Sequence, residues 1–131
     1  FEELIDKLDL FTQIINNRLL FKNIKVSAES GFCIVDADNP ENVLDLSKLS
    51  SGEKQEIVLF YDLIFNVESE LLLLIDEPEI SLHITWQRKF LEDLLKVTKR
   101  SKLEVVVATH SPQIINNNWD LQIDLGELYG K

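Results

Sequence analysis

The spacing of apolar residues between charged ones predicts two amphipathic helices in the first half of the chain. Residues 2–19 carry apolar side chains three and four positions apart, which is the helical repeat. A second run of this kind begins at Ser50. Between the two, residues 24–37 alternate or run apolar on either side of Gly31. This stretch predicts two strands joined by a turn.

The second half of the chain predicts two strands separated by a third helix. Residues 71–75 are five consecutive aliphatic residues, which is typical of a strand buried on both faces of a parallel sheet. Residues 104–108 form a similar strand, followed by a helix with Ser111 as its N-cap. The tail, residues 119–131, predicts a last strand and a frayed end. The helix between the strands has an apolar stripe of Trp86, Phe90, Leu91, Leu94 and Leu95.

The order strand, helix, strand over residues 71–108 predicts a βαβ unit with two parallel strands. Asp76 and Glu77 follow the first strand, and His110 follows the second. Parallel strands end at the same edge of a sheet, where open α/β sheets bind their ligands. We therefore expect two acids and a histidine at one cleft, although more than thirty residues separate them in the sequence.

The segment "LSSGEKQ", residues 49–55, predicts a helix start that can bind an anion. Ser50 and Glu53 have the spacing of a capping box, and Gly52 would let a ligand approach the backbone closely. Free N–H groups at such a helix start bind phosphate. Together with a carboxylate for Mg²⁺, a second carboxylate that orients water and a histidine, this segment points to phosphoryl transfer to water.

Composition narrows the function classes. The chain has 131 residues, of which 45% are hydrophobic, so it predicts one globular domain or part of one. Its 13 basic and 23 acidic residues give a net charge of −10, which disfavours a broad contact with a nucleic-acid backbone. The single cysteine, Cys33, cannot form an internal disulfide, and no apolar run approaches the roughly 18 residues of a membrane span. We expect a cytoplasmic protein with no membrane partner.

Three motifs over residues 47–113 resemble those of ABC-type ATPases, in the order of that family. "LSSGEKQ" resembles the signature motif, "LLLLIDEPE" the Walker B strand and "VVVATHS" the switch-histidine strand. Within the family, "DEPEISLH" is similar to the overcoming-lysogenization-defect (OLD) proteins and SMC-like AAA-family ATPases of DNA repair and phage defence, rather than to membrane transporters. Ile84 stands where that branch often has proline, which affects a turn. The resemblance implies a P-loop NTPase α/β fold, with a mostly parallel sheet flanked by helices.

The resemblance also implies a role for each residue at the sheet edge. Asp76 would coordinate Mg²⁺, directly or through water, and Glu77 would polarise the attacking water. His110 would contact the γ-phosphate of ATP. The loop from Ser81 to His83 would signal across a dimer interface, although a helix cap is the more ordinary role for His83.

In this family the signature motif completes the ATP site of the opposite protomer. The resemblance therefore implies a homodimer, arranged head to tail with nucleotide between the protomers. The cofactor-binding residues that it implies here are Ser50, Ser51, Gly52 and Glu53.

One expected motif is absent from the sequence. No G-x-x-x-x-G-K-[ST] phosphate loop occurs, and the glycines are Gly31, Gly52, Gly126 and Gly130. The sequence therefore resembles the carboxyl-terminal portion of the ATPase and predicts a separate N-terminal lobe as its partner. We expect a single partial domain in which residues 1–46 follow an omitted insertion and residues 47–131 carry the three motifs.

Three functions fit these motifs. The first is an ATP-hydrolysing engine of a DNA-repair or anti-phage defence protein, and the second is an ATP-gated clamp or sensor that controls a partner nuclease. The third is an inactive scaffold, against which the intact Asp76 and Glu77 argue. Any DNA or nuclease partner would bind through regions outside this segment. Each motif alone has an ordinary reading: "LSSGEK" as a helix start, the paired acids as a solvated strand end and His110 as a cap. The ordinary reading of all three together requires three coincidences at one sheet edge, and we reject it.

Overall fold

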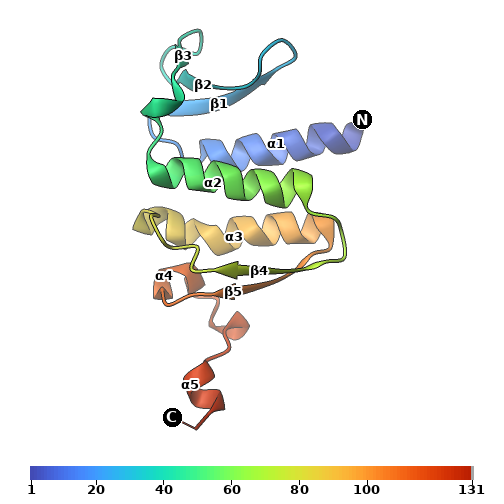
Figure 1. Ribbon diagram of the computed structural model, residues 1–131, viewed down its shortest axis with the longest axis vertical. Helices are drawn as coiled ribbons and strands as arrows, with labels where there is room; N and C mark the ends of the chain where they lie inside the picture. Colours follow the sequence, from blue (N-terminus) through green and yellow to red (C-terminus); the bar gives the residue numbers. More distant parts are fainter. Residues whose placement is uncertain (131) are drawn as a thin grey trace.

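Three helices lie between two small sheets in the computed structural model, which describes residues 1–130 (Figure 1). The helices are α1 (Glu2–Asn16), α2 (Ser51–Tyr61) and α3 (Ile84–Ser101). The first helix ends three residues earlier than predicted. The side chain of Asn16 bonds both backbone groups of Ile24, at 2.7 and 3.3 Å, and so fastens the following strand to the end of α1.

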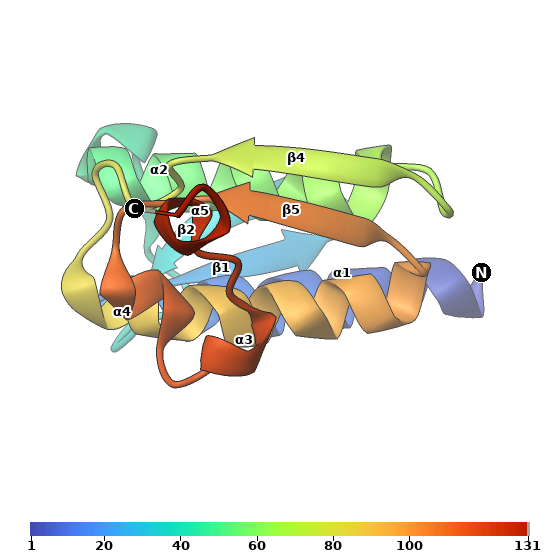
Figure 2. The ribbon, with the colours of Figure 1, turned by 90° about the horizontal axis from the view of Figure 1, so that it is seen from below.

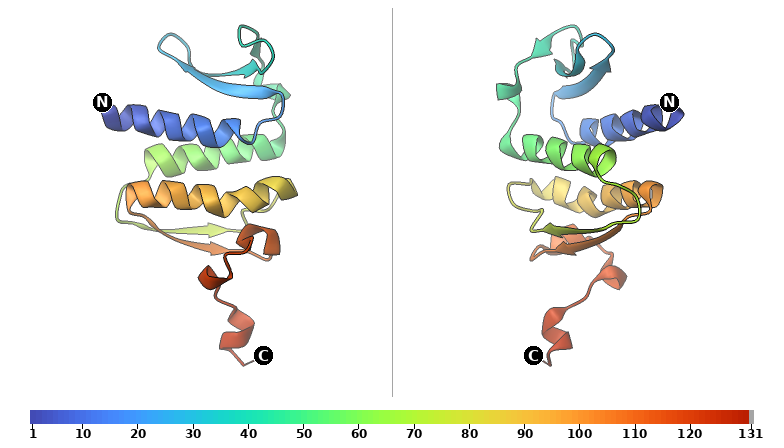
Figure 3. Two further views of the ribbon diagram at one scale, coloured as in Figure 1. Left: turned by 180° about the vertical axis from the view of Figure 1, so that it is seen from behind. Right: turned by 45° about the vertical axis from the view of Figure 1, so that its right-hand side comes forward.

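The first sheet is antiparallel and contains β1 (Lys22–Ser27), β2 (Gly31–Asp36) and β3 (Val43–Leu44). The predicted strand pair is confirmed, with Ile24 opposite Ile34, and Gly31 begins β2 at a φ of +69°. The short β3 was not predicted, because its two residues carry no repeat. This sheet packs against α1, on the side away from α2 and α3 (Figures 1 and 3).

The second sheet consists of β4 (Leu72–Asp76) and β5 (Glu104–Ala108), which are parallel and in register from Leu72 opposite Glu104 to Asp76 opposite Ala108. The βαβ prediction is confirmed, since α3 connects the two strands. Figure 2 views this sheet from below, with the helices behind it.

Only one face of the parallel sheet is covered by the described residues. Leu73, Ile75, Val105 and Val107 pack against the helical core. Leu72, Leu74 and Val106, on the opposite face, are 61%, 72% and 53% exposed. The prediction that residues 71–75 are buried on both faces is therefore wrong for residues 1–130, because the three helices all lie on one side of the sheet.

The hydrophobic core fills the space between the helices and both sheets. Trp86, Phe90 and Leu94 of the predicted apolar stripe are buried in it, and Phe60 of α2 meets Phe90 edge to face with ring centroids 6.1 Å apart. Short helical turns connect the main elements. They are η1 (Leu46–Lys48), the π-helical η2 (Asp62–Asn66) that continues α2, and η3 (Trp119–Leu121).

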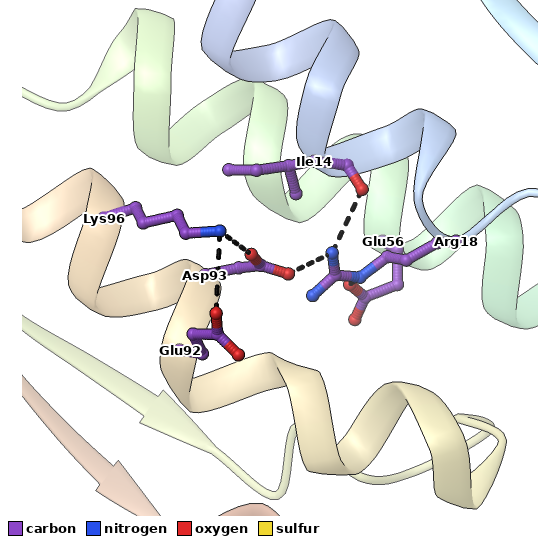
Figure 4. Close-up of polar contacts among 6 residues, drawn as sticks. All are labelled: Ile14, Arg18, Glu56, Glu92, Asp93 and Lys96. Atoms are coloured by element: carbon purple, nitrogen blue, oxygen red, sulfur yellow. Dashed lines mark hydrogen bonds and ion pairs between the residues drawn. The ribbon is translucent and has the colours of Figure 1, made fainter.

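A buried group of three charged side chains joins the turn after α1 to α2 and α3 (Figure 4). We call Arg18, Glu56 and Asp93 the ion cluster. Nε of Arg18 lies 2.7 Å from Oε2 of Glu56, Nη1 donates to Asp93, and the guanidinium stacks over Phe60. Burial, with a smaller contribution from the nearby charge of Asp93, raises the pKa of Glu56 to about 7, against the lowering effect of Arg18.

The C-terminal segment is helical where the sequence predicts a strand. After α4 (Pro112–Ile115), the chain forms η3 and then α5 (Leu125–Leu128), which extend away from the parallel sheet (Figure 3). Asp124 explains the difference, because its carboxylate accepts hydrogen bonds from the N–H groups of Gly126 and Glu127 and so begins a helix. Residue 131 lies outside the described residues. Within residues 1–130, every helix falls short of the length and apolar character that crossing a membrane requires.

Candidate functional site

The predicted acids lie at the carboxyl edge of the parallel sheet. Asp76 is the last residue of β4 and is exposed. The N–H of Glu77 donates to the carbonyl oxygen of Ala108 at 2.7 Å, which extends the pairing of β4 with β5 by one step. The two strands therefore end side by side, as the βαβ prediction required.

Glu77 and His110 meet at this edge. Oε1 of Glu77 lies 3.5 Å from Nε2 of His110, and the two side chains are 41% and 90% exposed. Glu77 adopts a left-handed backbone conformation with a φ of +46°, which ends the strand at this residue. Such a conformation is uncommon for a residue other than glycine and is concentrated at functional sites. The sequence prediction that these residues come together is confirmed.

Two further polar residues, which the sequence analysis did not assign, fasten the loops around His110. Oε1 of Glu79 accepts the backbone N–H of His110 at 3.0 Å. The amide of Gln87 donates to the carbonyl oxygen of Leu82 at 3.1 Å and accepts the hydroxyl of Ser111 at 2.6 Å. The only sequence feature that pointed to Glu79 was its position in "DEPE", and no sequence feature pointed to Gln87.

Hydrogen bonds set the charge state of Glu79. Burial alone would raise the pKa of this carboxyl, but hydrogen bonds from its own N–H, from the side chain of Thr109 and from the N–H of His110 together lower it. Glu79 is therefore a carboxylate acceptor that is held against the backbone of His110.

The start of α2 has the predicted capping box. Oγ of Ser50 accepts the N–H of Glu53 at 3.1 Å, and Oε1 of Glu53 accepts the N–H of Ser50 at 2.8 Å. Glu53 is only 4% exposed and also pairs with Lys22 at 2.9 Å. Burial would raise the pKa of Glu53, but these hydrogen bonds and the charge of Lys22 together lower it. Its side chain serves the helix start, whereas Ser50 and Ser51 are exposed.

Gly52 lies against the chain's own loop. A Cβ atom at this position would be 2.5 Å from the carbonyl oxygen of Ser81 and 3.3 Å from the ring of Trp86. The prediction was that a ligand approaches the backbone at Gly52, whereas the close neighbour in this structure is the backbone of residue 81. The signature segment therefore touches the loop that follows Glu77.

Two predicted helix caps differ in outcome. His83 is the N-cap of α3, and its Nδ1 accepts the N–H of Thr85 at 3.2 Å, so the structural role of His83 is confirmed. Ser111 holds the N-cap position of α4, but its side chain makes no capping hydrogen bond. The hydroxyl of Ser111 is directed to Gln87 instead.

An open cavity of about 530 Å³ lies between α2 and the end of β4. Asp76 is on its wall, together with Lys54 and Gln55 of α2 and Asp62 at the start of η2. A ligand that reaches Asp76 can therefore also contact the outer face of α2.

The donor set suits Mg²⁺. Among residues 1–130, no group of three or more His, Cys, Asp or Glu side chains could hold a metal ion by itself. Asp76 nevertheless presents one exposed carboxylate. Mg²⁺ typically binds one or two carboxylates, several waters and the phosphates of a substrate, so a single aspartate at a nucleotide site fits this ion.

The family follows from comparison with known proteins. The model of the family described as "AAA domain, putative AbiEii toxin, Type IV TA system" matches residues 3–116. The chain belongs to this family. The match includes all three motifs and supports the resemblance to AAA/ABC-type ATPase domains, so the family is one of ATPases.

Two similar proteins support the same assignment. "Retron Ec83 probable ATPase" of Escherichia coli is 30% identical over 105 residues, which are 72% of this chain and 19% of that protein. The chain thus spans about a fifth of the length of this relative. A solved structure from work on "ATP-driven dimerization and DNA stimulated activation of SMC ATPases" matches with a TM-score of 0.53 and 15% identity, over 86% of this chain and 76% of that one. This likeness shows the P-loop NTPase-like α/β fold.

Proposed function

We propose that this chain forms part of an ATP-binding and ATP-hydrolysing engine that dimerises around nucleotide. The observation that carries the proposal is the contact of 3.5 Å between Glu77 and His110 at the carboxyl edge of a parallel sheet, next to the exposed Asp76. A carboxylate that orients water, a polar group for the γ-phosphate and a carboxylate for Mg²⁺ are the parts that phosphoryl transfer to water requires.

In this proposal Glu77 orients the attacking water and accepts its proton. The water oxygen bonds to the γ-phosphorus, the bond from that phosphorus to the bridging oxygen of ADP breaks, and the proton later passes from Glu77 to solvent. His110 contacts the γ-phosphate through its exposed imidazole. Asp76 would hold Mg²⁺, which neutralises charge on the phosphates when it is bound.

The signature segment acts in the opposite protomer. Ser50, Ser51 and the N-terminal N–H groups of α2 would contact the γ-phosphate of ATP held by that protomer, while the buried Glu53 and Gly52 fix the shape of the segment. The phosphate loop would come from an N-terminal lobe outside residues 1–131. ATP-driven dimerisation of SMC ATPases, which share the fold, supports this arrangement.

We place the complete protein in cytoplasmic DNA repair or anti-phage defence. The support is the similarity of "DEPEISLH" to the OLD and SMC-like branch. The net charge of −10 disfavours a nucleic-acid contact on this segment, so we propose that any DNA partner binds other regions of the protein.

A substitution of Ser51 tests the cross-protomer contact. In the full-length protein, Ser51→Arg should block association driven by a non-hydrolysable ATP analogue, because the larger side chain would occupy the place of the partner's phosphate. Binding of nucleotide to one protomer should change little. Light scattering with and without the analogue measures association. Ser69→Arg adds the same side chain on the exposed loop before β4, at the other end of the sheet, and serves as the control.

A second experiment tests the need for the N-terminal lobe. Residues 1–131 alone should neither bind ATP tightly nor hydrolyse it, because they contain no phosphate loop. Calorimetry with Mg²⁺ present measures this. Micromolar binding by this segment would contradict the proposed division of the site between two lobes.

A further inference from the structure

The exposed imidazole of His110 has little side-chain support of its own. Its side chain is 90% exposed, and the contact with Glu77 at 3.5 Å is its one ion pair among residues 1–130. A surface side chain with so few contacts samples several rotamers. The position of His110 relative to Glu77 therefore depends on how firmly the backbone of residue 110 is held.

Glu79 holds that backbone. The chain returns toward β5 two residues after Glu77, and Oε1 of Glu79 accepts the N–H of His110 at 3.0 Å. Glu79 and His110 are 31 positions apart in the sequence. Their bond therefore joins the loop that carries Glu77 to the backbone of His110. A carboxylate acceptor makes a stronger hydrogen bond than a neutral acceptor, and the lowered pKa of Glu79 agrees with this state.

Gln87 makes a second link between the two loops that meet at His110. From the first turns of α3, its amide links the carbonyl oxygen of Leu82 to the hydroxyl of Ser111. The loop from Glu77 to His83 and the loop from Thr109 to Ser111 are thus cross-linked on both sides of His110. Because Gly52 packs on Ser81, the signature segment adjoins the first of these two loops.

We propose that Glu79 is a positioning residue, which sets the placement of His110 relative to Glu77 during ATP hydrolysis, and that Gln87 supports it. The inference rests on the proposed function. Glu79 touches no reacting atom and acts through the backbone of His110. Misplacement of a group by about 1 Å can reduce a rate by as much as about 10²-fold, so the loss of this bond should be visible in turnover.

Steady-state ATP hydrolysis by the full-length protein tests the proposal. Glu79→Ala should lower kcat about 10-fold or more while KM for ATP changes less than about 2-fold, since binding of nucleotide does not use this bond. Glu79→Gln retains an oxygen that can accept the N–H of His110, so it should recover most of the activity. Glu68→Gln removes a charge from an exposed loop before β4 and should match the parent protein.

A double-mutant cycle separates positioning from general loss of structure. If Glu79 acts through His110, then Glu79→Ala should have almost no further effect on kcat in a His110→Ala background. The inference is overturned if the effects of Glu79→Ala and His110→Ala on kcat multiply in the double variant. It is also overturned if Glu79→Ala raises KM and lowers the melting temperature, because Glu79 would then have only a structural role. Equal kcat for Glu79→Ala and the parent would also overturn it. If the parent protein itself hydrolyses no ATP, the proposed function fails instead, so the two failures are distinguishable.

Discussion

The protein holds carboxylates in two contrasting environments. In the ion cluster, Glu56 and Asp93 are buried among three helices and share one arginine, Arg18. At the sheet edge, Asp76 is exposed and Glu77 is 41% exposed, with Nε2 of His110 3.5 Å from Oε1 of Glu77. Buried charges require partners because water has been removed, whereas exposed charges remain available for a ligand. The first region therefore serves the stability of the fold, and the second is free to do chemistry.

Helix α2 connects the two regions. Gly52 and Glu56 are one turn apart and both are buried, so they lie on the same face of the helix. Gly52 touches the loop after Glu77, and Glu56 belongs to the ion cluster. Variants on either side should therefore separate effects on stability from effects on hydrolysis.

Removal of the arginine should have the largest effect. Arg18→Met leaves the buried Glu56 without its counter-charge, and it leaves Asp93 with only Lys96, whose Nζ lies 3.4 Å from its Oδ1. The loss should lower the free energy of unfolding by about 3–5 kcal/mol. Urea unfolding followed by circular dichroism measures it. The triple variant Arg18→Met, Glu56→Leu, Asp93→Leu is the control, because it removes all three charges together and should recover most of the loss. A single Arg18→Met variant as stable as the parent would contradict the view of the cluster as a structural group.

The same kind of charge removal at the sheet edge should affect hydrolysis rather than stability. Glu77→Gln in the full-length protein should lower hydrolysis by roughly 10²-fold, the scale for loss of a positioned base, with nucleotide binding largely kept. The ATP-bound dimer should accumulate. The free energy of unfolding should change by less than about 0.5 kcal/mol, since the side chain is half exposed.

Asp76→Asn provides the comparison within the site. Because Asp76 is assigned to Mg²⁺, this variant should weaken Mg²⁺-dependent binding of ATP itself. Phosphate release and equilibrium binding with fluorescent nucleotide distinguish the two variants. If Glu77→Gln hydrolyses ATP as fast as the parent, Glu77 is not the catalytic carboxylate.

The raised pKa of Glu56 predicts a pH effect that originates in the ion cluster. The pKa is about 7 in the folded chain, against an ordinary value of 4.5 for a glutamate in an unfolded chain. Between these values the folded state keeps a proton that the unfolded state has lost. The free energy of unfolding should therefore fall as the pH rises from about 4.5 to about 7, by about 3 kcal/mol, and then level off.

Glu56→Gln tests the origin of this pH effect. The amide cannot ionise, so the fall in stability between pH 4.5 and 7 should be reduced in this variant. Urea unfolding at several pH values measures it, with Glu92→Gln as the control because Glu92 is exposed on α3. An unchanged pH dependence would assign the effect to other carboxyl groups.

The contrast between the regions also explains what the sequence could predict. The capping box of Ser50 and Glu53 is a pattern over a few neighbouring residues, and the meeting of Glu77 with His110 follows from the parallel strands of one βαβ unit. The ion cluster joins Arg18 to Asp93 across 75 positions, and no local pattern encodes such a contact. The tail was predicted as a strand because its apolar residues alternate, but Asp124 caps a short helix there and no described strand pairs with it.

Among the variants that should lose stability, Gly52→Ala should show the smallest loss, at the point where α2 meets the site. In Gly52→Ala the new Cβ would lie 2.5 Å from the carbonyl oxygen of Ser81, so the loop after Glu77 must shift. Overpacking costs about 1–3 kcal/mol, but alanine favours a helix over glycine by about 1 kcal/mol, and the exposed loop at Ser81 can move. The net loss should be about 1 kcal/mol in urea unfolding. Ser51→Ala, at an exposed neighbouring position, is the stability control, and a larger loss there than in Gly52→Ala would show that the contact with Ser81 is not what requires glycine.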